Sequence, residues 1–222
     1  MSHIDIKKNL INIQKKITST LQAYPHLHEP TLVAVSKRQP YEHILCALQA
    51  GLRDFGENFL QEAQERWLHI RTEFPDLKLH YIGHIQSNKV KDIVALFDVI
   101  HTVDREKVAR RIAHEMVSQN KNISCFIQVN IGKELQKSGV MPEDFSTFYK
   151  LCHDDLGLPI QGVMSMPPAG QDPEVFFHHT KQIADQFSLP NISMGMSQDY
   201  VQAIRAGATH IRIGEALLGK RQ

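Results

Sequence analysis

Cysteine is scarce in this 222-residue chain, and the three that occur are poorly placed for chemistry. Cys46, Cys125 and Cys152 form an odd set without a close pair, which excludes a disulfide framework and a CxxC metal knuckle. No HExxH motif or paired His–Cys spacing uses the 13 histidines, so we expect no metal site. A reducing cytoplasm is the default compartment for such a chain.

The sequence also lacks long apolar runs and an excess of charge of one sign. No segment approaches about 18 uncharged apolar residues, so we expect no membrane-spanning helix. The amphipathic N-terminus lacks the apolar core of a secretory signal. Lys and Arg total 25 against 24 Asp and Glu, a net charge of +1 that favours neither nucleic acid nor an anionic membrane as a partner.

The remaining composition is that of an ordinary globular protein. Hydrophobic residues make up 42% of the chain and charged residues 22%, which excludes disorder. The length suits one domain better than two small ones, and no linker, low-complexity tract or composition break separates a second domain. We therefore expect a single domain over residues 1–222.

Strand-like and helix-like segments alternate along most of the chain. A first helix is expected from Ile4 to Ala23, with an apolar face formed by Ile6, Leu10, Ile13, Ile17 and Leu21. Eight apolar, β-branched strands are expected at 32–36, 53–57, 79–84, 98–102, 124–130, 160–166, 191–195 and 209–214. Helices are expected at 41–50, 58–74, 88–96, 104–119 with Asp104 as its cap, after Pro142, at 173–187, before 206 and from 215.

Eight βα units after one leading helix predict an α/β fold, a single (β/α)8 TIM barrel with an extra N-terminal helix. An open, doubly wound sheet is the alternative. No GxGxxG motif follows the first strand to support it. In a barrel the functional residues lie at the carboxyl ends of the strands, so the polar residues there are the candidates.

Lys37 follows the apolar run of the first strand. Partial desolvation there lowers the pKa of an amine and prepares it for a Schiff base with an aldehyde. On position alone, a solvent-facing lysine is the commoner interpretation. Asn58 ends the second strand, and His84 after the third is a candidate acid or base whose commoner role is structural.

The strongest local pattern lies near the end of the chain, in SMGMS (Ser193–Ser197) and RIG (Arg212–Gly214). Gly195 and Gly214 are expected at turns before helices, and Ser197 adds a hydroxyl donor. Helix starts after the seventh and eighth strands form the recurrent phosphate site of barrels, although a tight turn explains either glycine equally well.

Arg212 alternates with Ile211 and Ile213 along the last strand, which predicts an inward guanidinium. Such a group is costly to bury unless it meets an acceptor. A ligand ring nitrogen or carboxylate is one candidate acceptor, and a structural ion pair with Glu57 is the other.

Six motifs occur in order along the chain: VAVSK (Val33–Lys37), FGEN (Phe55–Asn58), IGHIQSNK (Ile82–Lys89), KSG (Lys137–Gly139), SMGMS (Ser193–Ser197) and RIG (Arg212–Gly214). On these motifs the chain resembles the pyridoxal 5′-phosphate homeostasis protein family over nearly its whole length. The resemblance implies a barrel like the N-terminal domain of alanine racemase and covalently bound pyridoxal 5′-phosphate (PLP). It also implies an effect on vitamin B6 and amino-acid balance, without established enzymatic turnover.

The resemblance further implies a role for each matching residue. Lys37 corresponds to the Schiff-base lysine, Ser197 with backbone N–H groups around Gly195 and Gly214 to the phosphate cradle, Arg212 to the pyridine-nitrogen partner, and Asn58 to the ring's polar edge. The chain departs from the family's usual pattern at Arg38–Pro40, where Gln39 stands in place of a common lysine, at Phe59 and at Gly162–Pro168.

The leading functional hypothesis is a PLP-binding homeostasis protein. It would hold PLP as an internal aldimine on Lys37 and buffer or deliver it, acting as a monomer with PLP-dependent apoenzymes as recipients and without appreciable turnover. Two alternatives remain at this point: a PLP-dependent racemase or lyase of small amino acids, and a phosphate-binding barrel enzyme without PLP.

Overall fold

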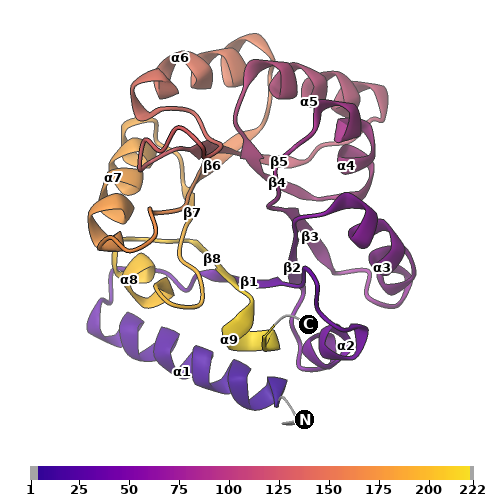
Figure 1. Cartoon of the computed structure of the whole chain (residues 1–222), viewed down its shortest axis with the longest axis vertical. Coiled ribbons are helices and arrows are strands. Elements are labelled where there is room, and N and C mark those ends of the chain that lie inside the picture. The colour runs from indigo at the N-terminus through magenta and orange to yellow at the C-terminus, as the bar shows by residue number, and fades with distance from the viewer. Residues whose placement is uncertain (1–4, 221–222) are drawn as a thin grey trace.

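The structure, a computed structural model, describes residues 5–220, and eight parallel strands within them close into a barrel. The strands pair in chain order, and β8 pairs with β1 to close the ring that lies at the centre of Figure 1. The predicted (β/α)8 barrel is confirmed. The strands are β1 (Thr31–Val35), β2 (Asp54–Glu57), β3 (Lys78–Tyr81), β4 (Val99–Val103), β5 (Ser124–Val129), β6 (Ile160–Ser165), β7 (Asn191–Ser193) and β8 (His210–Ile213).

Helices surround the ring of strands on its outside (Figure 1). The α-helices are α1 (Ile6–Ala23), α2 (Tyr41–Gln49), α3 (Leu60–Glu73), α4 (Val90–Leu96), α5 (Glu106–Ser118), α6 (Phe145–Lys150), α7 (Pro173–Gln186), α8 (Tyr200–Arg205) and α9 (Glu215–Leu218). Short 3-10 turns at Ser87–Lys89 and Pro142–Asp144 precede α4 and α6, and one π-helical turn, Leu151–Asp155, follows α6.

The leading helix α1 lies outside the eight βα units and packs against α2, α8 and α9. Asp5 caps the start of this helix, because its side chain accepts a hydrogen bond from the Lys8 amide at 2.9 Å. Ile6, Leu10 and Ile13 of the predicted apolar face are buried. Ile4, the expected first residue of this helix, lies outside the described residues. The extra N-terminal helix is therefore confirmed.

The apolar core lies between the outer face of the barrel and the helices. Trp67 of α3 is fully buried there and packs on Phe55 of β2, with ring centroids 4.9 Å apart. The inside of the barrel is different, because it holds polar rings. His80, His101 and His210 converge there with Phe126, and the His101 and Phe126 rings stack at 4.4 Å.

Two local predictions are wrong. Strand β3 ends at Tyr81, three residues before the expected end, because the chain turns away at Gly83 against the Asn58 carbonyl. A Cβ at Gly83 would lie 2.1 Å from that oxygen. Asp104 does not cap α5, whose start has no side-chain cap; its carboxylate instead accepts from the neighbouring Arg105 guanidinium at 2.5 Å.

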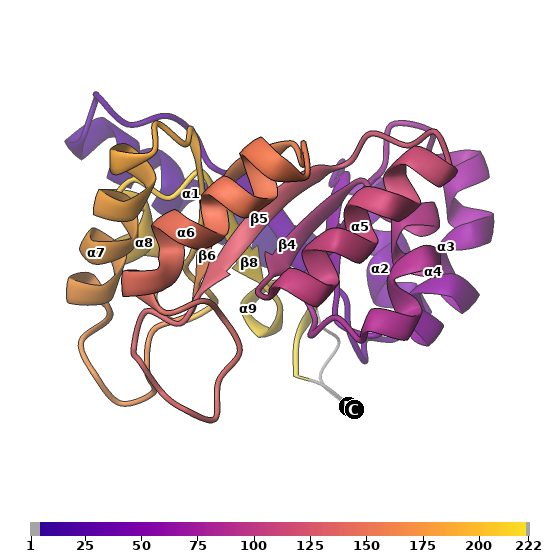
Figure 2. The same cartoon turned by 90° about the horizontal axis from the view of Figure 1, so that it is seen from above.

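Loops at the carboxyl ends of the strands project together on one side of the barrel, as the long connections after β5 and β6 show in Figure 2. Within residues 5–220, no helix is long and apolar enough to cross a membrane. The same residues contain no group of three His, Cys, Asp or Glu side chains arranged to hold a metal ion.

Candidate functional site

A cavity of about 360 Å³ lies at the carboxyl ends of the strands. Its volume falls within the roughly 300–1,000 Å³ of small-molecule pockets. Five of the six predicted site residues line it: Lys37, Asn58, Ser197, Arg212 and Gly214. The structure therefore brings together residues that lie up to 177 positions apart (37 to 214) in the sequence.

Lys37 is half-buried at the mouth of β1, and a buried cluster holds the backbone just before it. The Ser36 hydroxyl donates to Glu57 Oε1 at 2.8 Å, and the Arg66 guanidinium donates to the same oxygen at 2.6 Å and to the Ser36 carbonyl at 3.1 Å. Trp67 Nε1 is a third donor to Glu57, at 2.9 Å. Burial raises the pKa of Glu57, and the charge of Arg66 opposes that shift.

Arg212 points into the barrel as predicted and is only 4% exposed. It donates from Nη1 to Ser193 Oγ at 2.7 Å and from Nη2 to the Ser165 carbonyl at 3.0 Å. The alternative ion pair with Glu57 does not form, because Arg66 occupies that carboxylate. Burial lowers the pKa of Arg212 to about 10, and the charge of Asp199 opposes the shift, so the guanidinium stays charged at neutral pH.

The loops after β7 and β8 meet at Ser197. Its Oγ accepts a hydrogen bond from the Ala216 amide at 3.3 Å, which places a hydroxyl beside a backbone N–H group at the edge of the cavity. Asp199 and Glu215 also line the cavity, so its charge is mixed. Asp199 Oδ1 accepts a hydrogen bond from the Met196 amide at 2.6 Å.

Gly195 supports the site from behind and is not among the residues that line the cavity. Its φ of +88° lies in the region that favours glycine, and a Cβ there would lie 2.5 Å from the Ala203 Cβ. Its carbonyl accepts from the Arg212 amide at 3.0 Å, which ties the loop to β8. Gly214 is less constrained, because a Cβ there would meet Val35 at an ordinary 3.5 Å.

Gly195→Ala is expected to lower the free energy of unfolding by about 2 kcal/mol or more, from backbone strain together with the clash on α8. Gly51→Ala is the matched control, because Gly51 has a φ of +95° and open space around its Cβ position. The control should lose only the strain, about 1 kcal/mol. Urea unfolding measures both; equal losses would contradict the packing role of Gly195.

Asn58 links this cavity to a second one. Its Oδ1 is buried and has no hydrogen-bond partner among the described residues. An unsatisfied buried acceptor costs about 1–3 kcal/mol, so the position calls for a donor from a ligand or from water. The same residue lines both cavities.

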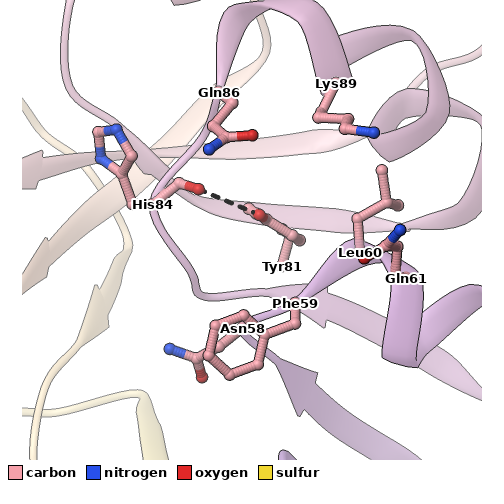
Figure 3. Close-up of a pocket in the computed structure, with 8 residues that line it drawn as sticks. All are labelled: Asn58, Phe59, Leu60, Gln61, Tyr81, His84, Gln86 and Lys89. Atoms are coloured by element: carbon pink, nitrogen blue, oxygen red, sulfur yellow. Dashed lines mark hydrogen bonds between the residues drawn. The ribbon is translucent and has the colours of Figure 1, made fainter.

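The second cavity, of about 490 Å³, was not predicted (Figure 3). Tyr81 and His84 lie on it, and the Tyr81 hydroxyl donates to the His84 carbonyl at 3.1 Å. The His84 ring contacts the Ser138 hydroxyl at 3.1 Å, so it joins the β3 loop to the β5 loop. His84 is therefore outside the Lys37 cavity. The lining residues are Asn58, Phe59, Leu60, Gln61, Tyr81, His84, Gln86 and Lys89.

Known proteins resemble this chain over nearly its full length. The family described as "Alanine racemase, N-terminal domain" matches residues 9–222. A pyridoxal phosphate homeostasis protein of Vibrio alginolyticus is 37% identical over 227 aligned positions, covering 97% of each chain. The chain belongs to the pyridoxal phosphate homeostasis protein family. The resemblance inferred from the six motifs is thereby confirmed.

Solved structures of the family share the fold. PipY of Synechococcus elongatus matches with a TM-score of 0.87 without PLP and 0.83 with PLP bound, at 30% and 31% identity, and in both cases 97% of this chain is covered and 100% of PipY. Alanine racemase of Corynebacterium glutamicum is 15% identical with a TM-score of 0.69, and 60% of its chain is covered. That likeness concerns the barrel alone.

The sequence analysis did not predict the apolar residues that line the Lys37 cavity. Met164, Met166 and Met196 supply an apolar wall together with Ile82. Each lies at or just beyond a strand end, and this position was the signal in the sequence that could have identified it. Apolar residues at strand ends are also typical of an ordinary core, so the signal was not specific. A flexible thioether wall suits a flat apolar ring, since methionine adapts its shape to what it contacts.

Proposed function

We propose that this protein holds PLP covalently on Lys37 and buffers or delivers it. The observation that carries the proposal is the convergence of an amine, a hydroxyl and a buried guanidinium on one cavity, at Lys37, Ser197 and Arg212. These three groups match the aldehyde, the phosphate and the ring nitrogen of PLP. The PLP bound to PipY and the names of the homeostasis relatives support this assignment.

Each residue has a separate task in this proposal. When bound, PLP supplies an aldehyde that bonds reversibly to an amine, which keeps it from modifying other amines. Lys37 provides the amine, and the Ser36–Glu57–Arg66 cluster holds the strand end that carries it. Ser197, with backbone N–H groups around Gly195 and Gly214, would provide donors to the phosphate, and Arg212 would donate toward the ring nitrogen. Asn58 would lie near the polar edge of the ring.

An ultraviolet–visible spectrum tests the proposal and separates it from a phosphate-binding barrel without PLP. We expect an absorption band at about 420 nm in the PLP-loaded protein, and its loss on borohydride reduction. A protein that takes up no PLP under these conditions contradicts the proposal.

Ser197→Ala is expected to weaken PLP retention by one charge-assisted hydrogen bond, about 1.5–3 kcal/mol, or about ten- to hundredfold in Kd. Pyridoxal, which lacks the phosphate, should bind the wild type poorly and be nearly indifferent to the substitution. Equilibrium dialysis with both ligands gives the comparison. Equal sensitivity of the two ligands would rule out the phosphate role of Ser197.

We also propose that the protein turns over no amino acid at an appreciable rate. Arg212 is a donor only and cannot pass a proton to the ring nitrogen, which makes the ring a weak electron sink. A racemase then needs a second base opposite Lys37. All five tyrosines lie within the described residues and none lines the Lys37 cavity, while His84 lines the other one.

Alanine in deuterated water tests the absence of turnover. With PLP-loaded protein, we expect no exchange of the α-proton of L- or D-alanine above the level of free PLP. Exchange at about 1 s⁻¹ or faster, which His84→Ala abolishes, would place the protein among ordinary enzymes and favour the racemase alternative.

Three broader features complete the proposal. The chain acts in the cytoplasm as one domain over residues 1–222, as a monomer, with PLP-dependent apoenzymes as recipients. Mixing the loaded protein with an apoenzyme, and following the recovery of that enzyme's activity against an equal amount of free PLP, measures delivery. Size-exclusion chromatography with light scattering measures the molar mass in solution and so tests whether the protein is a monomer.

A further inference from the structure

A continuous chain of hydrogen bonds crosses the inside of the barrel and ends at Arg212. The Arg212 guanidinium donates to Ser193 Oγ at 2.7 Å, and the Ser193 hydroxyl lies 2.8 Å from His101 Nδ1. His101 Nε2 lies 2.9 Å from His80 Nδ1, and His80 Nε2 lies 2.9 Å from Asp54 Oδ1. The chain therefore links β8, β7, β4, β3 and β2 without a gap.

The Asp54 carboxylate fixes the direction of the hydrogen bonds in this chain when each histidine carries one proton. A carboxylate can only accept, so His80 donates to it from Nε2 and accepts at Nδ1. His101 must then donate to His80 from Nε2, which leaves His101 Nδ1 as the acceptor of the Ser193 hydroxyl proton. Arg212 has no acceptor and donates to a lone pair of Ser193 Oγ, so the Arg212 end agrees with this order. Both histidines are Nε2–H tautomers in this arrangement.

Burial keeps the chain in that state. The side chains of Ser193 and His101 are fully buried, and His80 is 1% exposed. Burial and then the facing His80 hold the pKa of His101 well below its usual value, which favours the neutral ring. The Phe126 ring stacks on His101 with an interplanar angle of 3°, which fixes the plane of the imidazole.

The orientation of these hydrogen bonds also helps to compensate the buried charge of Arg212. Both hydrogen bonds described above for this guanidinium reach neutral oxygens, of Ser193 and Ser165. A buried cation needs compensation, and aligned hydrogen bonds in a low dielectric polarise one another. Here every acceptor end points toward Arg212, and the chain terminates at a carboxylate, Asp54, whose side chain is 28% exposed.

We propose that Ser193, His101, His80 and Asp54 form an oriented relay that positions the Arg212 guanidinium at the PLP cavity. A substitution at Asp54 then changes the affinity for PLP, although Asp54 does not contact the ligand. The four are positioning residues, and none of them lines the cavity. The proposal rests on the proposed function in that it assigns the relay's effect to PLP retention. The relay itself is a property of the unliganded protein.

The first test measures tautomers in the unliganded protein by NMR of ¹⁵N-labelled histidine at pH 8. His80 and His101 are both expected as Nε2–H tautomers. In Asp54→Ala, His80 loses its acceptor, and we expect Nδ1-protonated His101 to become populated, although Asp54 does not contact His101. Asp54→Asn keeps an acceptor oxygen and is expected to restore the wild-type pattern. An Nδ1–H tautomer of either histidine in the wild type overturns the relay.

The second test measures the Kd for PLP by equilibrium dialysis. Ser193→Ala is expected to raise the Kd about tenfold, the effect of one hydrogen bond to a charged group, and Asp54→Ala about threefold. Asp54→Asn should stay within about twofold. Thr20→Val is the matched control, because Thr20 is also buried and its hydroxyl donates to the Lys16 carbonyl at 2.7 Å on α1, away from Arg212 and the cavity; its Kd should not change.

The outcomes separate the relay from the proposed function. A wild type that takes up no PLP contradicts the proposed function, while the tautomers of the unliganded protein still decide the relay. Asp54→Ala with an unchanged Kd and an unchanged His101 tautomer overturns the relay, whatever Ser193→Ala does. If Ser193→Ala fails to fold by circular dichroism, the partly exposed Asp54 variants carry the test alone.

Discussion

Lys37→Ala is expected to abolish the covalent PLP adduct that borohydride traps in the wild type. The reason is chemical, since an alanine offers no amine to the aldehyde, and Lys37 is the lysine that lines the cavity shared by Ser197 and Arg212. The fold should survive, because Lys37 is half-buried just beyond β1 and belongs to neither the strand nor a helix. Mass spectrometry of the reduced protein measures the loss, and circular dichroism measures the fold.

Lys89→Ala is the matched control for this experiment. Lys89 lines the neighbouring cavity and is also half-buried, so it has a comparable setting without the convergent hydroxyl and guanidinium. The control should keep the full adduct. Peptide mapping that locates the wild-type adduct on Lys89 or Lys137 would contradict the assignment of Lys37 as the attachment site.

Acidification from pH 7 toward pH 4 is expected to remove a large part of the folding stability. Burial, and then the nearby His80, lower the pKa of His210 from its usual 6.5 to about 4. Between pH 6.5 and pH 4 the unfolded chain binds a proton at this histidine and the folded chain does not. The contribution of His210 to the free energy of unfolding is therefore fully present above about pH 6.5 and is lost as the pH falls. His210 alone accounts for a loss on the order of 3 kcal/mol. His101, whose pKa is also lowered, adds to it in the same direction.

Urea unfolding at several pH values, without PLP, measures this loss. His210→Leu should remove one titrating group and make the stability fall less steeply between pH 6.5 and pH 4. His28→Gln is the control, since His28 is exposed and should leave the slope as it is. A wild-type stability that stays flat over this range would contradict the neutral histidine cluster.

The histidine cluster has a second consequence for the barrel. Polar rings meet inside the barrel, where apolar side chains dominate in most barrels of this kind. Such a packed polar network stabilises the fold only while its members are satisfied, and Asp54, Ser193 and Arg212 satisfy it from three strands. The interior therefore links the stability of the barrel to the residue that faces the proposed ligand.

The order of elements and the strand-end positions of the candidate residues were determined by the sequence alone. Strand and helix periodicities are properties of short windows, so eight βα units and the extra N-terminal helix could be counted before any contact was known. Candidate residues at strand ends meet at one end of a barrel, which is why Lys37, Asn58, Ser197, Arg212 and Gly214 line one cavity.

Tertiary structure alone decided which partners these residues meet. Sequence alternation showed that Arg212 points inward but left its acceptor open between a ligand and Glu57. The closed barrel assigns Glu57 to Arg66 and Arg212 to Ser193. Likewise Tyr81 and His84 line a second cavity because β3 ends early, at Tyr81, and Gly83 then approaches Asn58 closely, which no local pattern records.

The relay is the clearest case of that difference. His101 and Ser193 are 92 residues apart and lie on strands that are not neighbours, β4 and β7. Their contact depends on how far the strands slide past one another when the barrel closes, and that register is a property of all eight strands together. Local propensity fixes which side chains face inward; only closure of the barrel decides which of them touch.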